Sequence, residues 1–411
     1  MKKKLLTMIV TVSMVTALLA GCGNAASEDG DGRTETENAG TEDAGSTEEG
    51  AADGDFKGTI KIGGIGPLTG SAAVYGQAEA NAAQIAADEI NAAGGINGYR
   101  VEFKFEDDEC DAEKAVNAYN TLKDWDMQIL AGTTTSGCCI AVEDSASQDN
   151  MFLLTPSGSA VECITGDNAF RVCFSDPNQG AASAKYIGEH AIASKVAVIY
   201  DSSDIYSTGI YEKFAAEAAN QPFEVVAAEA FTADSRTDFN TQLKKAQESG
   251  AELVFLPIYY TEASLILAQA DKMGYAPMFF GCDGLDGLLQ VENFDTALSE
   301  DVMLLTPFAA DADDELTQKF VAAYKERFHE VPNQFAADMY DALYIIKAAC
   351  EAAGVTGDMS ASEICDALKP VMPTITVDGL TGEGITWTAD GEPDKAPKAV
   401  KIVNGVYTAM D

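Results

Sequence analysis

The sequence is poor in histidine and in basic residues. His190 and His329 are the only histidines in 411 residues, which leaves little for imidazole base catalysis or a histidine-rich metal site. Lys and Arg number 26 against 66 Asp and Glu, a net charge of −40. The field of such a molecule repels nucleic acid and anionic lipid headgroups, so we set nucleic-acid binding aside. An enzyme would have to use carboxylates, hydroxyls or thiols.

The sequence also lacks the spacings of common metal sites. No C-x-x-C pair occurs among the eight cysteines that follow Cys22. An exported domain could pair these cysteines, but a domain of this size does not need disulfides. The acidic cluster at residues 106–111 lacks the spaced ligands of a calcium loop, and we expect the cluster at 311–315 to begin a helix. We therefore predict no metal and no cofactor.

The first 56 residues differ in composition from the rest of the chain. Three lysines at residues 2–4 precede an apolar run that ends in LAGC at residues 19–22, a pattern similar to an export signal with a bacterial lipoprotein processing box. We therefore expect residues 1–21 to be a signal peptide and Cys22 to be lipidated. Lipidation with two or more acyl chains would anchor the protein stably in a membrane. Residues 22–56 are mostly acidic or small, which predicts a disordered tether. No later apolar run has the length of a membrane span.

From residue 57 onward, short apolar runs alternate with helical patterns. This alternation predicts parallel sheets with helices on both faces. The pattern restarts at KVAVIYD, residues 195–201, so we expect two α/β lobes that face each other across a cleft. The expected helices are residues 76–93, 112–125, 138–150, 207–220, 239–249 and 262–273. The expected strands after the first are residues 99–108, 128–132, 151–157, 195–201, 223–231, 253–260 and 277–283.

The loops that follow these strands differ between the two lobes. Ligands of such sheets bind beyond the carboxyl ends of the strands, next to helix N-termini. Hydroxyl residues fill positions 133–136 and 157–159 in lobe 1. The lobe 2 loops carry Tyr206, Tyr259, Tyr260, Asp283 and Asp286. Hydroxyls and free N–H groups suit a carboxylate and an acid suits an ammonium, so the loops predict a receptor for a small zwitterion. The alternative is that these residues are helix caps and half-buried aromatics.

Three motifs make the body similar to a known family. They are GPLTG…YG at residues 66–76, N-x-x-GGI-x-G at 91–98 and TP-x-x-S at 155–159. In this order they resemble the leucine/isoleucine/valine-binding proteins, the solute receptors of branched-chain amino acid ABC importers. The resemblance extends over residues 57–411.

The resemblance implies a type I periplasmic-binding-protein fold, with two doubly wound α/β lobes that are joined by three crossovers and close on a ligand by a hinge. Lobe 1 is then expected to comprise residues 57–179 and 307–381, and lobe 2 residues 180–306 and 382–411.

The resemblance also implies which polar groups hold a ligand. Ser136 corresponds to the serine that binds the ligand carboxylate. Ser157 occupies the position that supplies a backbone carbonyl, and Ser159 the position that supplies a hydroxyl and an N–H. Asp283 corresponds to the acid that receives the ammonium, but it is one methylene shorter than the usual glutamate. Such a change is common in relatives with other ligands.

Three tyrosines match aromatic positions of the family. Tyr75 corresponds to the aromatic residue before the first helix, and Tyr206 and Tyr259 to the aromatic residues of lobe 2. The loop around Tyr206 is one residue longer than is usual, which leaves its placement open. Many members have a disulfide from the position of Cys110, whose usual partner position holds Thr135 here. Cys110 could pair with Cys138 or Cys139 or stay free.

The glycines of IKIGGIGPLTG, residues 60–70, allow a second interpretation. Gly64 and Gly66 fit the first two positions of a dinucleotide-binding loop, but the third falls on Thr69. We expect Gly63, Gly64 and Gly66 instead to let the strand turn sharply, so that the loop to Tyr75 forms one cleft wall. A dinucleotide-dependent enzyme remains the alternative from a different functional class, that of enzymes rather than binding proteins.

We therefore predict a monomeric, non-enzymatic receptor that is lipid-anchored on the outer face of the cell membrane. It would capture a small amino acid, branched-chain or aliphatic, and deliver it to an ABC permease in the cytoplasmic membrane. The same fold could instead bind an amide, an aromatic acid or a nucleoside, or serve as a sensory module for a kinase. Its serines have no histidine partner for nucleophilic catalysis.

Overall fold

The computed structural model describes residues 56–410. The predicted signal peptide, Cys22 and the predicted tether up to residue 55 lie outside the described residues. Among residues 56–410, no helix combines the length and the apolar character needed to cross a membrane.

The first lobe is built on a parallel five-stranded sheet in the order β2-β1-β3-β4-β5. Its strands are β1 (Thr59–Gly66), β2 (Arg100–Asp107), β3 (Ile129–Gly132), β4 (Leu153–Thr155) and β5 (Ala169–Arg171). Helices α1 (Ala73–Ala92) and α9 (Gln334–Ala353) bury their apolar residues with Ile60 and Ile62 on one face. Helices α2 (Ala112–Asp124) and α3 (Ser136–Asp149) pack with Ile65 and Leu130 on the other. The sheet is therefore covered on both faces, as predicted.

The second lobe is built on a seven-stranded sheet in the order β14-β13-β10-β9-β8-β6-β7. Its strands are β6 (Lys195–Asp201), β7 (Glu224–Phe231), β8 (Leu253–Leu256), β9 (Met278–Gly281), β10 (Met303–Thr306), β13 (Lys398–Val403) and β14 (Val406–Ala409). The first five are parallel, and β13 and β14 complete the sheet in antiparallel pairing. Its helices are α4 (Asp176–Glu189), α5 (Ile205–Ala218), α6 (Asn240–Glu248) and α7 (Tyr260–Met273).

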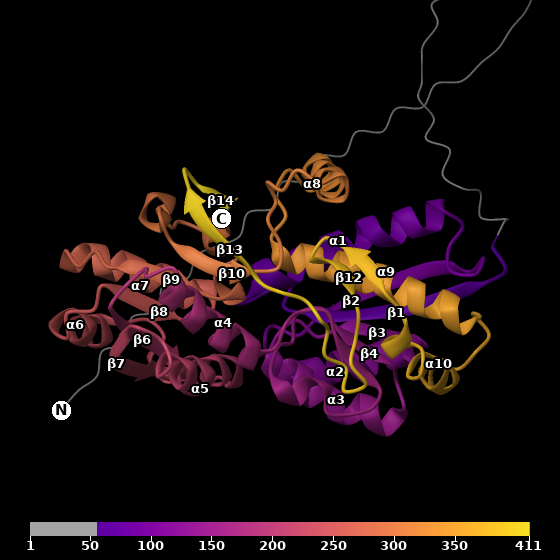
Figure 1. The fold of residues 1–411 in the computed structure, drawn as a ribbon. Helices are drawn as coiled ribbons and strands as arrows, with labels where there is room; N and C mark the ends of the chain where they lie inside the picture. Colours follow the sequence, from indigo (N-terminus) through magenta and orange to yellow (C-terminus); the bar gives the residue numbers. More distant parts are fainter. Residues whose placement is uncertain (1–55, 411) are drawn as a thin grey trace, which may run out of the picture. The chain divides into compact units, whose positions relative to one another are not determined.

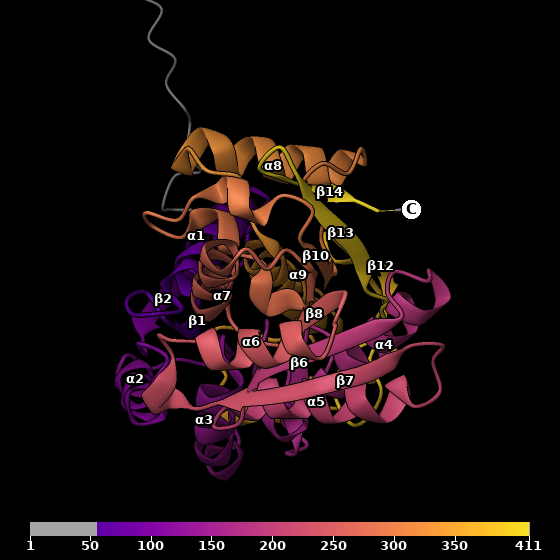
Figure 2. The ribbon, with the colours of Figure 1, turned by 90° about the vertical axis from the view of Figure 1, so that its left-hand side faces the viewer.

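The chain crosses between the two lobes more than once. After β10 it returns to lobe 1 as α8 (Glu315–Phe328), α9 and α10 (Ala361–Leu368), and then forms the hairpin β11 (Val377–Gly379) and β12 (Gly382–Ile385). Figure 1 shows α9 beside α1, and the segment after β12 running across to β13. Figure 2, turned by 90°, shows α8 along one edge of the body. The carboxylate of Asp314 caps α8 by accepting from Thr317 N–H, as the acidic cluster there predicts.

The predicted elements are present, with systematic differences at their ends. Helices α1, α3, α5 and α7 begin two or three residues earlier than predicted, because their first turns carry tyrosines, serines and small residues that give no helical periodicity. The predicted strand 253–260 is too long: β8 ends at Leu256, and Tyr260 already belongs to α7.

The glycines of β1 have a different role from the one predicted. Gly63, Gly64 and Gly66 lie within β1, which runs straight through them, so the prediction of a sharp turn is wrong. A Cβ at Gly63 would lie 2.2 Å from Met127 Sδ, and one at Gly66 would lie 2.0 Å from Thr134 Oγ1. The glycines leave room for side chains from neighbouring segments to approach the strand.

The cysteines of the described residues are all free thiols. Cys110 is not paired with Cys138 or Cys139; its sulfur lies 3.7 Å from Thr135 Oγ1. Burial raises the pKa of Cys110 to about 11. The family disulfide at this position is therefore absent from this structure.

Candidate functional site

One buried cavity brings together all seven residues predicted to bind a ligand. Its lining comprises Tyr75, Ser136, Ser157, Ser159, Tyr206, Tyr259 and Asp283, together with Thr134, Thr135, Gly284 and Phe335. Except for Phe335 at the start of α9, every one of these residues follows the carboxyl end of a parallel strand, where loops lead into helix N-termini. The two lobes each contribute one wall.

The wall from lobe 1 consists of hydroxyls and backbone N–H groups. Ser136 Oγ accepts hydrogen bonds from the N–H groups of Ser159 and Ala160, at 3.2 and 3.1 Å. A hydroxyl that accepts two bonds still has its own hydrogen to donate. Ser159 Oγ lies 3.5 Å from Ser136 Oγ. Two hydroxyls thus lie side by side on this wall and can both donate to an anionic group.

The wall from lobe 2 is centred on a buried acid. Asp283 is 3% exposed. Its Oδ1 accepts from the Tyr206 hydroxyl at 2.6 Å, and its Oδ2 accepts from the Gln179 side-chain amide at 2.8 Å. Burial raises the pKa of Asp283 to about 6, and these two hydrogen bonds oppose the rise. At neutral pH the carboxylate is mostly ionised, and among residues 56–410 no cationic side chain forms an ion pair with it.

Aromatic rings fill the space between the two walls. The Tyr75 ring stacks on Phe335 with centroids 3.9 Å apart, and Tyr206 stacks on Tyr259 at 4.9 Å. The Tyr75 hydroxyl also donates to the Gly284 carbonyl at 2.5 Å, a hydrogen bond between the lobes. The remaining cavity volume is about 10 Å³, close to the minimum that holds one water molecule. A ligand larger than water can enter only if the lobes separate or the rings turn.

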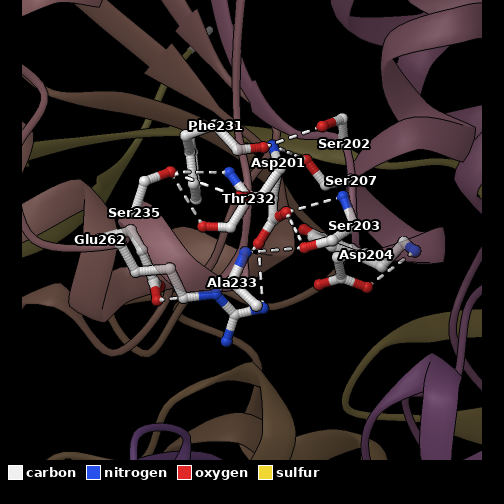
Figure 3. Close-up of polar contacts among 12 residues, drawn as sticks. Asp201, Ser202, Ser203, Asp204, Ser207, Phe231, Thr232, Ala233, Ser235 and Glu262 are labelled. Atoms are coloured by element: carbon white, nitrogen blue, oxygen red, sulfur yellow. Dashed lines mark hydrogen bonds and ion pairs between the residues drawn. The ribbon is translucent and has the colours of Figure 1, made fainter.

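A polar network supports the loop that carries Tyr206. Figure 3 shows Asp201, the last residue of β6, and Ser203 of this loop beside Thr232 and Ala233, with Asp204 further along the loop. Asp201 accepts from the N–H and hydroxyl of Ser203, at 2.8 and 2.6 Å. Asp204 caps α5 by accepting from Tyr206 N–H at 3.1 Å. Despite its extra residue, the loop thus places Tyr206 in the first turn of α5, against Asp283.

Arg236 connects this loop to a second one. Its guanidinium lies 2.9 Å from Asp201 Oδ2 and 3.9 Å from Glu262 Oε1, in the first turn of α7. Asp201 ends β6, directly before the loop that presents Tyr206, and Glu262 follows Tyr259 by three residues. One arginine therefore pairs with an acid near each of two cavity tyrosines without lining the cavity itself.

Sequence reasoning missed several residues of the site. Gln179, which holds Asp283, lies in the first half of α4 and gave no signal of its own. Phe335 comes from α9. The only sequence feature that could have pointed to it is its position near the start of a helix, two residues after the capping residue Asn333. Glu79 is buried directly behind the lobe 1 wall and hydrogen-bonded to Thr134 and Ser157. Neither histidine of the chain lines the cavity, and both are exposed.

Comparison with known proteins identifies relatives of this chain. The family model of the periplasmic binding proteins matches residues 59–405. Leu/Ile/Val-binding protein homolog 3 of Brucella melitensis is 30% identical over 341 residues, covering 81% of this chain and 88% of that protein. The leucine-, isoleucine-, valine-, threonine- and alanine-binding protein of Pseudomonas aeruginosa is 28% identical, covering 76% of this chain and 82% of that protein.

Solved structures give the same picture for the fold. The branched-chain amino acid transporter substrate-binding protein LivJ of Streptococcus pneumoniae, solved with isoleucine, superposes with a TM-score of 0.77 at 29% identity, covering 85% of this chain and 98% of that one. An ABC transporter solute-binding protein of R. palustris, solved with benzoate, has a TM-score of 0.76 at 18% identity, covering 86% and 95%. The second likeness concerns the fold alone.

Proposed function

The chain belongs to the periplasmic binding protein family and has its type I fold, and from this we propose that it captures a small amino acid, branched-chain or aliphatic, for an ABC importer. The seven predicted ligand residues of the cavity are part of this proposal. So are the predicted lobe boundaries, which divide the chain at residues 179, 306 and 381; the last of these falls in the turn of the hairpin β11–β12.

The observation that carries the proposal is the opposite chemistry of the two cavity walls. Ser136 and Ser159 on lobe 1 present hydroxyl donors, which suit a carboxylate. Asp283 on lobe 2 presents a buried carboxylate without a cationic partner among the described residues, which suits an ammonium. A zwitterion that bridges the walls favours the closed arrangement, and the aromatic rings favour an apolar side chain between them.

The setting of this activity is also part of the proposal. The family is extracytoplasmic, which agrees with the export signal expected at residues 1–21. Lipidation at Cys22 holds a monomeric receptor at the outer face of the cell membrane. There it delivers its ligand to a permease in the same membrane, and it performs no enzymatic reaction.

A thermal-shift screen of residues 57–411 tests the ligand class. A ligand that binds only the native state stabilises it by RT ln(1 + [L]/Kd), about 4 kcal/mol at a thousandfold excess over Kd. We expect leucine, isoleucine or valine to raise the melting temperature, whereas amides, aromatic acids and nucleosides leave it unchanged. Two leucine analogues serve as matched controls: 4-methylpentanoate lacks the ammonium, and leucinamide lacks the carboxylate. A shift produced only by another class of compound would overturn the proposed ligand.

A further inference from the structure

Glu79 is a fully buried acid behind the lobe 1 wall of the cavity. It lies in α1, one helical turn after Tyr75, and is 0% exposed. Its carboxyl group contacts Thr134 and Ser157, which both line the cavity but come from the loops after β3 and β4. One side chain thus contacts both loops that form the wall.

The hydrogens available at Ser157 decide the protonation state of Glu79. Ser157 Oγ lies 2.8 Å from Glu79 Oε1 and 2.8 Å from the Thr134 carbonyl oxygen. A serine hydroxyl has one hydrogen, and a carbonyl oxygen can only accept. If Glu79 were ionised, it too could only accept, and one of these two contacts would have no hydrogen.

Both contacts are satisfied when Ser157 donates to the Thr134 carbonyl and a protonated Glu79 donates to Ser157 Oγ. The other carboxyl oxygen, Glu79 Oε2, then accepts from Thr134 Oγ1, 2.5 Å away. Every side-chain O–H hydrogen of these three residues then has an acceptor.

The charged groups around Glu79 favour the same state. Burial raises the pKa of Glu79 well above its ordinary value. Asp338 of α9 and Asp108 after β2 both raise it further by repulsion. Lys395 lies 3.8 Å from Asp338 and forms an ion pair with that residue rather than with Glu79.

We propose that Glu79 acts as a protonated positioning residue, whose carboxylic acid joins the Thr134 and Ser157 loops and so sets the geometry of the wall that faces the ligand. The expected effect of Glu79 on ligand binding rests on the proposed function, whereas its protonation and its two hydrogen bonds do not. Glu79 itself touches no ligand, since it does not line the cavity.

An infrared experiment tests the proton without any ligand. We expect the wild-type protein at neutral pH to show the carbonyl band of a protonated carboxylic acid that is missing from Glu79→Gln. Glu143→Gln is the matched control: this buried acid of α3 accepts from Gly166 N–H at 2.9 Å, away from the cavity, and its replacement should leave the band of Glu79 unchanged. If wild type and Glu79→Gln have identical spectra where protonated carboxylic acids absorb, the proposal is overturned, whatever ligand the protein binds.

Leucine titrations then test the positioning role. Glutamine keeps one donor for Ser157 and one acceptor for Thr134, so we expect Glu79→Gln to weaken leucine binding by no more than about threefold. Glu79→Leu keeps the volume but neither hydrogen bond, so we expect a loss of about tenfold or more. Equal losses for the two variants would contradict the proposal. If neither the wild type nor the variants bind leucine, the proposed function fails, but the infrared result still decides the protonation state of Glu79. If Glu79→Leu does not fold, the titration of Glu79→Gln and the infrared band remain decisive.

Discussion

At the scale of single residues, Asp283 combines three properties that seldom occur together. It is buried, it is mostly ionised at neutral pH, and two neutral donors rather than a cation hold it. A buried carboxylate of this kind costs stability unless a cation compensates it. The ligand ammonium is the cation that we propose.

Asp283→Asn separates binding from folding. The amide keeps the shape but cannot attract an ammonium, so we expect leucine affinity to fall by at least about a hundredfold, as for removal of a buried charge partner. The variant should melt at the same temperature as wild type or higher, because it no longer buries a charge. Calorimetric titration and a melting curve measure both quantities, and unchanged affinity would remove the ammonium assignment.

Ser159→Ala should have a smaller effect. It removes one hydroxyl that we propose to donate to the ligand carboxylate, and it leaves the Ser159 N–H in place. The expected loss is about 1.5 to 3 kcal/mol of binding free energy, the usual value for a hydrogen bond to a charged group. The same titration checks it, and wild-type affinity would mean that the hydroxyl is only part of a turn.

At the scale of elements, the site depends on how loops are held behind it. The segments that present Tyr206 and Tyr259 follow different strands, β6 and β8, and Arg236 joins them through Asp201 and Glu262. Asp201 and Glu262 are both almost fully buried. We therefore expect the arginine to influence the aromatic part of the cavity from outside it.

Arg236→Met should weaken leucine binding by about three- to tenfold and also lower the melting temperature, because it leaves the almost fully buried Asp201 and Glu262 without their cation. Lys245→Met is the matched control, since Lys245 pairs with Glu229 on the same lobe but far from the loops of the cavity. Side-by-side titrations check the difference. If the two variants bind equally well, Arg236 does not position the tyrosines.

Much of this element arrangement could be predicted because it follows from local patterns. Short apolar runs between helices predicted the parallel strands up to β9 except β5, which has only three residues, and helix α4 was not predicted either. The family motifs in the loops after these strands gave the seven residues that line the cavity. The glycines of β1 could not be interpreted in this way, because their neighbours Met127 and Thr134 come from distant parts of the chain. For the same reason Phe335 and Gln179 were missed: what places them at the site is the packing of α9 and α4.

At the scale of the whole molecule, several buried acids make stability depend on pH. Burial raises the pKa of Asp108, Asp204 and Asp283 to about 6 and that of Asp286 to about 7. Between their ordinary pKa and these values, the folded protein keeps protons that the unfolded chain releases. Stability is therefore highest at the acid end of this window and decreases as pH rises through it.

Stability and affinity should then respond to pH in opposite directions. From about pH 5 to about pH 7.5, we expect the melting temperature without ligand to fall by about 5 °C or more. Over the same range leucine affinity should rise about tenfold, because Asp283, with a pKa of about 6, becomes ionised. Melting curves and titrations at each pH check both trends. Affinity that does not change with pH would show that Asp283 does not titrate during binding.

The packing of α9 against α1 also has a consequence for how the protein is made. These two helices share one core, yet all of β6 to β10 lies between them in the chain. When the N-terminal half leaves the ribosome, α1 can pack on its own sheet, but the part of its apolar face that contacts α9 stays uncovered until α9 has been synthesised. Contacts between such distant segments slow folding. Delayed folding suits the export that we propose for this chain, and a chain cut before α9 would leave part of the apolar face of α1 uncovered.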